Sequence, residues 1–341
     1  MTGPSFAVAV SIRSFLAARP AGGRSLLHDR RVGRSSLRDR RGAKCAIFRR
    51  GVTDGRGIRS QLVTRAFPRA MKQRGFDMRI AVIGGTGLIG SRVVTTLEAT
   101  GHEVVVVARA VGVDSFTGEG LADALAGVET IVDVSNSSYT DEAGAREFFA
   151  ASTLNQLTYG DAAGVRHHVA LSVVGTDRLA RSEGGYFQAK AEQERLLTAS
   201  GRPFSIVHAT QFFEFIRSIT DAATRSGIAH VADALIQPMA ADDVAAAVAR
   251  TALARPTGGI TEHAGPEVFE LGYLAQRELR FRRDEREVVA DPLATYFGAR
   301  LDRWELLPGG DATIAPTRFH EWQVARRDGD DALLPSVAGV R

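Results

Sequence analysis

Tyr186 and Lys190 lie four residues apart in a segment, 186–200, whose pattern predicts a helix. At this spacing the two side chains share one face of the helix, with Cβ atoms about 6 Å apart. Tyrosine titrates at about pH 10, and a neighbouring ammonium favours the phenolate and so lowers the tyrosine pKa. Tyr186 could then donate a proton to a carbonyl oxygen, or remove one in the reverse direction. The alternative is a Tyr/Lys pair on an exposed helix without a catalytic role.

A glycine-rich turn lies between an apolar run at 79–83 and a helical pattern at 88–100. Residues without a Cβ allow backbone N–H groups to approach a pyrophosphate at a helix N-terminus. The strand before the turn and the helix after it are the context that this motif requires. The alternative is a tight turn with only a structural role. We expect dinucleotide binding by the turn, whose residues are Gly84, Gly85, Thr86, Gly87, Leu88, Ile89 and Gly90.

This form of the turn resembles the short-chain dehydrogenase/reductase superfamily, and most of all its atypical, NmrA-like branch. The resemblance runs from Met78 to about Trp322 and is specific at the glycine turn, at the Ser172/Tyr186/Lys190 set and at the stretch HATQFFEF, residues 208–215. It implies an NAD(P)-binding Rossmann fold in which Tyr186 is the general acid. Lys190 would also hold the nicotinamide ribose, and Ser172 would hydrogen-bond the substrate oxygen.

The resemblance also implies roles for residues that are recognised only by their position after a strand. Ser135 and Asn136 follow the third predicted strand, where the superfamily places residues against the two riboses. His208 ends the fifth, where relatives are expected to carry arginine; it would contact cofactor or substrate, or serve a structural role. The catalytic asparagine of the superfamily has no match, because Asn155 lies too near Ser172, so the usual proton relay is in doubt.

Arg109 bears on the choice of dinucleotide. In Rossmann folds an acidic residue that closes the second strand favours NAD, whereas a nearby arginine favours NADP by binding the 2′-phosphate. Here the second strand ends at Arg109, and no acidic residue follows before Asp114. We therefore expect NADP, with NAD as the other possibility; a solvated arginine is the alternative.

Apolar runs alternate with helical patterns through the middle of the chain. The runs cover 79–83, 103–108, 130–134, 168–174 and 203–209, and the helical patterns cover 88–100, 121–126, 141–163 and 186–200. Such alternation predicts right-handed crossovers and a doubly wound parallel sheet. Asp242 and Asp243 are expected to cap a further helix, 242–254. We expect a Rossmann domain at 78–240, a small α+β substrate portion at 241–325 and a tail at 326–341.

The first 77 residues differ from the rest. They carry a net charge of +14, whereas residues 78–341 carry −10. The leader shows no period that would build a core, so we expect it to be disordered. It could be sequence that precedes the true start of translation at Met71 or Met78, a transit peptide, or a basic tail for nucleic acid. The acidic body gives no electrostatic case for binding nucleic acid or anionic membrane.

The few cysteine and histidine residues limit which catalytic and metal-binding chemistry the body of the chain can perform. Cys45, in the leader, is the only cysteine, so the body has no thiol for catalysis or metal ligation. This pattern fits the cytoplasm. His167 and His168 lack carboxylates at ligand spacing, so no metal is expected.

The sequence thus predicts an NAD(P)H-dependent reductase for a small carbonyl, quinone or related compound, acting as a monomer or homodimer. Two alternatives remain: an NADP-binding redox sensor that does not turn over, and a nucleotide-sugar epimerase or dehydratase.

Overall fold

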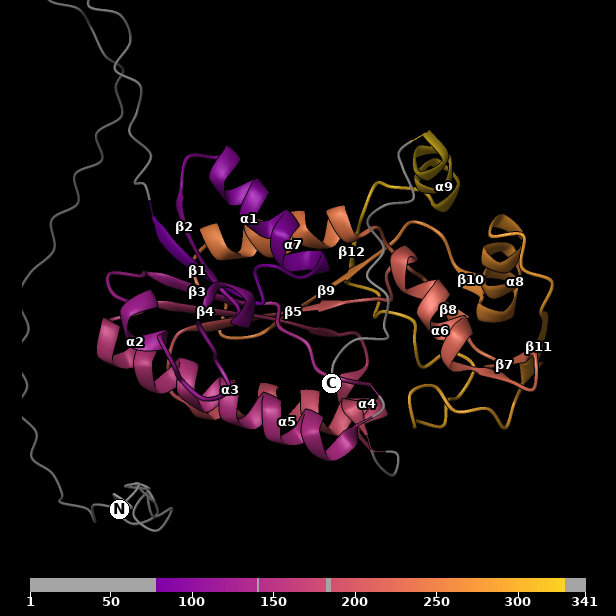
Figure 1. Cartoon of the computed structure of the whole chain (residues 1–341), viewed down its shortest axis with the longest axis horizontal. Helices are drawn as coiled ribbons and strands as arrows, with labels where there is room; N and C mark the ends of the chain where they lie inside the picture. The colour runs from indigo at the N-terminus through magenta and orange to yellow at the C-terminus, as the bar shows by residue number, and fades with distance from the viewer. Residues whose placement is uncertain (1–77, 140, 182–184, 329–341) are drawn as a thin grey trace, which may run out of the picture. The chain divides into compact units, whose positions relative to one another are not determined.

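The computed structural model describes residues 78–139, 141–181 and 185–328 (Figure 1). The predicted leader and all of the predicted tail after residue 328 lie outside the described residues.

Seven parallel strands form the main sheet, in the order β12-β9-β5-β4-β3-β1-β2. β1, β3 and β4 are almost wholly buried, as expected for strands covered on both faces. Strand order reverses between β1 and β3, and in such folds ligands bind beyond the carboxyl ends of the strands at this point. The strands are β1 (Arg79–Ile83), β2 (Glu103–Val107), β3 (Thr130–Asp133), β4 (His167–Val173), β5 (Phe204–Ala209), β9 (Ile260–Ala264) and β12 (Thr313–Ile314).

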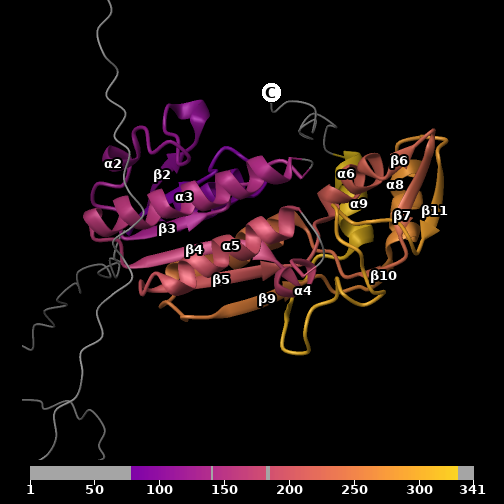
Figure 2. The same ribbon diagram turned by 90° about the horizontal axis from the view of Figure 1, so that it is seen from below.

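Helices cover both faces of this sheet. One face carries α1 (Leu88–Ala99) and α7 (Ala241–Leu253), which pack on each other, and the other carries α3 (Glu142–Ala163) and α5 (Tyr186–Ala199), which also pack together (Figures 1 and 2). Two short helices, α2 (Leu121–Ala124) and α4 (Thr176–Leu179), flank the second pair. The predicted doubly wound sheet is confirmed, with element ends shifted by one or two residues.

A second, smaller part follows β5 and extends beyond one end of the sheet (Figure 2). It holds two small sheets, β11-β7-β6 and β10-β8, with three helices. Its elements are α6 (Ile216–Ala222), β6 (Thr224–Arg225), β7 (Ile228–Ala232), β8 (Leu235–Ile236), β10 (Phe269–Glu270), α8 (Leu271–Phe281), β11 (Glu287–Asp291) and α9 (Phe319–Asp328).

The chain passes between the two parts more than once. It leaves the main sheet after β5, returns for α7 and β9, leaves again for α8 and β11, and returns for β12. The division expected at residue 240 remains a prediction about domains; by layer, α7 and β9 belong to the main sheet, and α6 to β8 belong to the smaller part.

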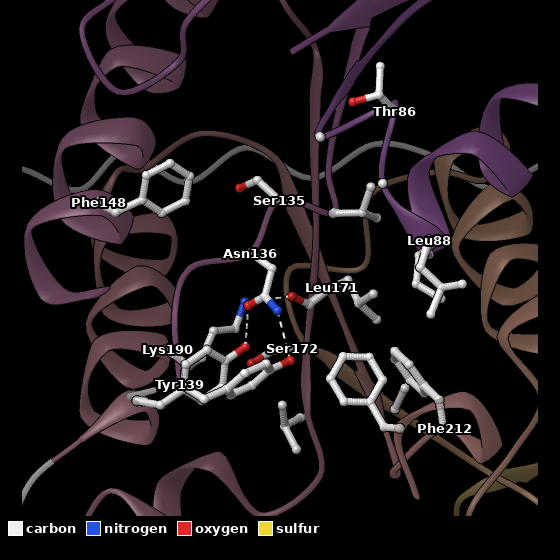
Figure 3. Close-up of a pocket in the computed structure, with 18 of the residues that line it drawn as sticks. Thr86, Leu88, Ser135, Asn136, Tyr139, Phe148, Leu171, Ser172, Lys190 and Phe212 are labelled. Atoms are coloured by element: carbon white, nitrogen blue, oxygen red, sulfur yellow. Dashed lines mark hydrogen bonds between the residues drawn. The ribbon is translucent and has the colours of Figure 1, made fainter. Parts of the chain in front are cut away.

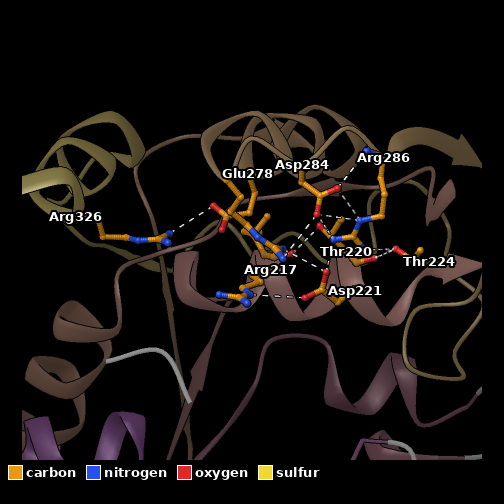
Figure 4. Close-up of polar contacts among 10 residues, drawn as sticks. Arg217, Thr220, Asp221, Thr224, Glu278, Asp284, Arg286 and Arg326 are labelled. Carbon is orange, nitrogen blue, oxygen red and sulfur yellow. Dashed lines mark hydrogen bonds and ion pairs between the residues drawn. The ribbon is translucent and has the colours of Figure 1, made fainter. Parts of the chain in front are cut away.

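Charged side chains hold the smaller part together (Figure 4). Arg286, between α8 and β11, donates to Asp221 of α6 at 2.6 Å and to Asp284 at 2.7 Å. The Arg286 guanidinium lowers the pKa of Asp284 to about 2. Glu278 is buried in α8 and pairs with Arg326 of α9 at 3.4 Å. A buried carboxylate needs such a partner, so these ion pairs fix how α6, α8 and α9 meet.

The cap of α7 differs from the prediction. The helix begins after Ala240, and the Glu214 carboxylate accepts a hydrogen bond from the Ala241 backbone N–H at 3.1 Å. Asp242 lies in the first turn and pairs with Arg92 at 2.7 Å, while Asp243 accepts from the Thr317 backbone at 3.2 Å. The two aspartates are therefore engaged by other elements, and a residue 27 positions earlier caps the helix.

Among the described residues, no helix combines the length and the apolar character that a membrane crossing requires.

Two buried histidines on β4 make stability depend on pH. Burial lowers the pKa of both His167 and His168 to about 4, so the folded protein keeps them neutral while the unfolded chain protonates them at about pH 6.5. The free energy of unfolding is therefore highest above pH 6.5. It falls as the pH drops toward 4, by up to about 3 kcal/mol for each histidine. Urea unfolding at several pH values should show this fall, and His168→Leu should flatten it. The exposed His320→Asn is the control, and equal slopes for all three proteins would contradict this account.

Candidate functional site

The glycine turn between β1 and α1 is built so that backbone approaches backbone. Gly84 has φ +79°, a region that favours glycine, and a Cβ there would lie 2.8 Å from the Cα of Ser135. A Cβ on Gly90 would lie 2.1 Å from the Gly84 carbonyl oxygen. Gly87 donates to the Gly84 carbonyl at 2.9 Å. Gly84 and Gly90 are therefore required by the fold itself.

Gly87 has a different role. It is the N-cap of α1, has φ −80° and has no side chain to cap the helix. The first amides of a helix have no partner within it, so they are left for an external acceptor. Gly84, Thr86, Gly87, Leu88 and Ile89 line a large cavity. The turn can therefore hold the pyrophosphate of a dinucleotide.

This cavity, about 510 Å³, extends from the glycine turn to the smaller part of the molecule (Figure 3). It brings together most of the residues predicted from sequence. They are Gly84, Thr86, Gly87, Leu88 and Ile89 of the turn, and Arg109, Ser135, Asn136, Ser172, Tyr186 and Lys190. Gly85 and Gly90 lie outside its lining: Gly85 packs against Val82 and Val106 of the strands, and Gly90 packs against the turn itself. Aromatic side chains form its far end.

The Tyr186 hydroxyl is held by Asn136. It donates to Asn136 Oδ1 at 2.8 Å, and Asn136 Nδ2 donates to the hydroxyl of Tyr139 at 2.7 Å. The rings of Tyr139 and Tyr186 contact at 4.5 Å between centroids. The Asn136 amide thus joins two phenols of the cavity, and its expected place at a ribose stays a prediction.

The pKa of Tyr186 is shifted in the direction opposite to that expected. Burial raises it well above its usual range, and the neighbouring phenols of Tyr139 and Tyr296 raise it further. The Lys190 ammonium, expected to lower it, donates instead to the Leu171 carbonyl at 2.8 Å and to Gln193 Oε1. Tyr186 is therefore a neutral phenol in this state of the protein.

Lys190 is held in the interior by a buried network. Gln193 donates to Asp133 Oδ2 at 2.9 Å, so the lysine and the aspartate are joined through one glutamine. The ammonium also lies 4.6 Å above the Phe149 ring. Desolvation lowers the pKa of Lys190 to about 8, against the opposing charges of Asp133 and Glu194. The lysine thus borders the cavity while its ammonium is tied to β3 and β4.

Ser172 is the penultimate residue of β4, and its hydroxyl donates a hydrogen bond to the carboxylate of Glu194, one turn beyond Lys190 on α5. Glu194 also accepts from His208 Nε2 at 3.0 Å. Ser172 faces the cavity, whereas the buried His208 is not among its lining residues. His208 therefore holds Glu194, which gives its expected cofactor contact no support. Because the Ser172 hydroxyl donates to Glu194, its oxygen can act toward the cavity only as a hydrogen-bond acceptor.

Arg109 and Asn155 have different surroundings. Arg109 follows β2 in a short 3-10 turn, is exposed and lines the cavity. Within the part of the chain that the structure describes, it has no ion-pair partner. Asn155 donates to the Ser115 and Phe116 carbonyls at 3.0 and 2.8 Å, so it fixes the loop after β2.

Several site residues were not predicted. Glu194 lies four residues after Lys190, so helical periodicity could have identified it. Asp133 and Gln193 become neighbours only through the crossing of β3 and α5. Tyr296 and Phe297 come from the smaller part and carried no sequence signal. Among the described residues, no group of three or more His, Cys, Asp or Glu could hold a metal ion.

No protein-family model matches this sequence, and no curated protein matches it. Solved structures do. MoeE5 in complex with UDP-glucuronic acid and NAD is 18% identical, with a TM-score of 0.56 over 73% of this chain and 99% of that one. The UDP-glucose 4-epimerase of Thermotoga maritima is 17% identical, with a TM-score of 0.53 over 67% and 88%. An NADPH-dependent quinone oxidoreductase of Escherichia coli, complexed with NADPH, is 25% identical, with a TM-score of 0.47 over 63% and 78%.

The MoeE5 structure holds UDP-glucuronic acid and NAD, and the Thermotoga epimerase structure holds UDP-glucose. At such identities the likeness is one of fold. It confirms the predicted Rossmann-type fold.

The geometry separates two glycines of the turn. Gly90→Ala forces a Cβ onto the Gly84 carbonyl, so stability should fall by about 1–3 kcal/mol. At Gly87 a Cβ would lie 3.2 Å from the same oxygen and the φ suits alanine, so stability should change little. Gly87→Ala should nevertheless weaken NADP binding, because its Cβ stands where a phosphate approaches. Thermal melts and cofactor titration measure the two effects. Gly259→Ala, in open space, is the control; a stable Gly90→Ala would contradict the packing argument.

Proposed function

We propose that this chain is an NAD(P)H-dependent reductase that acts on a small carbonyl compound, quinone or related molecule. The observation that carries the proposal is one continuous cavity, bordered by the glycine turn at one end and by the Tyr186 hydroxyl further along. A bound nicotinamide dinucleotide would supply the hydride. The residues of the chain would hold the two reactants in line and supply the proton.

The residues present fit such a cofactor. The turn leaves the first amides of α1 open to a pyrophosphate, and Ser135, beside the turn, is held by Asp133 through bonds from its backbone N–H and hydroxyl at 2.9 and 2.6 Å. Arg109 offers an unpaired guanidinium at the cavity border, which favours a 2′-phosphate and hence NADP. Lys190 would hold the nicotinamide ribose from the cavity wall.

Proton supply is assigned to Tyr186. A phenol whose pKa is raised stays protonated at neutral pH, which is the form that gives a proton to a carbonyl oxygen. Asn136 orients this hydroxyl, and Ser172 lies on the same wall. The expected role of Ser172 as a donor requires its hydroxyl to turn away from Glu194, so the proton is assigned to Tyr186 rather than to Ser172.

The fold alone also permits a nucleotide-sugar epimerase. Such a substrate carries a diphosphate, yet the charged residues among the described cavity lining are Arg109, Asp114 and Lys190, of which the first two follow β2. The far end of the cavity thus lacks the cations that bind phosphate. Consumption of NADPH in the presence of carbonyls and quinones separates the candidates, because an epimerase regenerates its cofactor and a redox sensor binds it without turnover.

Arg109→Ala tests the choice of cofactor. If the guanidinium binds the 2′-phosphate, NADP binding should weaken by roughly 1.5–3 kcal/mol, the range for charge-assisted hydrogen bonds. NAD lacks that phosphate, so its affinity should barely change. Titration of both dinucleotides against both proteins provides the comparison. Equal losses for the two, or no loss for either, would remove Arg109 from the cofactor site.

Tyr186→Phe tests the reaction. The change removes one hydroxyl whose partner, Asn136, is exposed and can turn to water, so folding and cofactor affinity should hold. General acid catalysis contributes about 100- to 10,000-fold, so the rate of NADPH oxidation should fall by that order. Tyr273→Phe, on the exposed face of α8, is the matched control and should keep full activity. Near-full activity in Tyr186→Phe would reject the tyrosine as general acid.

A further inference from the structure

Aromatic rings enclose the end of the cavity that lies away from the glycine turn (Figure 3). Tyr139 contacts Phe215 and Phe297 at 5.7 and 4.7 Å between ring centroids, and Phe212 contacts Phe215 at 5.6 Å. Tyr296 packs on Phe297 at 4.8 Å. These rings come from both parts of the molecule. Such walls suit a flat, apolar molecule, which can stack on one ring while it meets the edges of others.

One polar side chain in this aromatic end has no hydrogen bond. Gln211, just after β5, lines the cavity and is only 6% exposed. Among the described residues, neither its Nε2 nor its Oε1 forms a hydrogen bond of normal geometry. Its amide lies near enough to the buried Tyr296 hydroxyl to moderate the rise in the pKa of that phenol, yet without the geometry of a bond.

An unpaired buried amide lowers the stability of the fold, because it has lost its hydrogen bonds to water and forms none within the protein. Other buried glutamines of this protein show the usual solution. Gln156 donates to Asp133 Oδ2 at 2.8 Å and to Ser152 Oγ at 3.0 Å. Gln211 thus differs from Gln156 in one respect: its free amide belongs to the wall of a cavity large enough for a ligand.

We infer that Gln211 determines specificity by binding a polar substituent of a flat, uncharged aromatic substrate. The amide has a donor and an acceptor side by side, so it suits a group that can do both, such as a hydroxyl. The aromatic walls would hold the ring system, and the described lining of this end offers no charged side chain to pair with a charged substituent. The inference rests on the proposed function, because it places the substrate in the cavity that Tyr186 borders, and it narrows the substrate to an aromatic carbonyl compound with a second oxygen substituent.

Gln211→Met tests the inference, because methionine keeps the length and removes both hydrogen-bonding atoms. The probes are 2-naphthol and naphthalene, which share a ring system and differ by one hydroxyl. Binding is measured by fluorescence titration of the full chain without cofactor, so that it does not depend on hydride transfer. The native protein should prefer 2-naphthol by about tenfold or more, and Gln211→Met should lose this preference while its affinity for naphthalene holds.

Stability distinguishes this role from a structural one. Removing an unpaired buried amide should leave the Tm of Gln211→Met equal to or above that of the native protein. Gln156→Met, the matched change at a paired buried glutamine, should lower it. An unchanged preference in Gln211→Met, a fall in its Tm like that of Gln156→Met, or failure of both probes to bind the native protein would each overturn the inference. If only the proposed reductase function is wrong, the result differs. The native protein still prefers 2-naphthol to naphthalene, but it consumes NADPH with no carbonyl compound.

Discussion

The buried carboxylate of Asp133 is the interaction on which the site depends. It ends β3 where the strand order reverses, and a charge there must be compensated by donors. Four bonds reach it: two from Ser135, one from Gln156 of α3 and one from Gln193 of α5. Gln193 passes the connection to the Lys190 ammonium. One carboxylate therefore positions the loop after β3 and the helices α3 and α5. Through Gln193 it also positions the ammonium of Lys190, which lines the described cavity.

The same constraint reaches the glycine turn. Asp133 binds Ser135, and the Cα of that residue lies only 2.8 Å from where a Cβ on Gly84 would be. The turn after β1 and the loop after β3 thus pack backbone against backbone, and neither can move without the other. The glycine-turn end of the cavity and the wall that carries Lys190 are linked through the interior of the sheet, whereas the aromatic end is completed by residues of the smaller part.

Sequence patterns predicted the parts of this structure that depend on local chemistry. Apolar runs gave the strands, the glycines gave the turn, and the spacing of Tyr186 and Lys190 gave one helix face. The valine-rich run that forms β2 suggested a strand buried on both faces, but β2 lies at the edge of the sheet and only its last residue is buried. Contacts across the fold were not predictable, because nothing in a single strand or helix marks them. Asp133 and Gln193 are ordinary polar residues until the sheet brings them together, and the cap of α7 comes from Glu214 rather than from the adjacent aspartates. The pKa of Tyr186 was missed for the same reason: a lysine four residues away predicts a lowered value, and burial among other phenols decides the opposite.

The placement of protons in the cavity bears on the direction of the proposed reaction. The Ser172 proton is given to Glu194, and the Lys190 ammonium is bonded to Leu171 and Gln193. The Tyr186 proton is held by the exposed side chain of Asn136, so it can be released to an entering oxygen without breaking a buried contact. A carbonyl that accepts hydride develops negative charge on oxygen, and a neutral phenol is the donor that this charge requires. Oxidation of an alcohol would instead require the phenolate, which the same burial opposes. The environment that raises the pKa of Tyr186 therefore favours reduction over the reverse reaction.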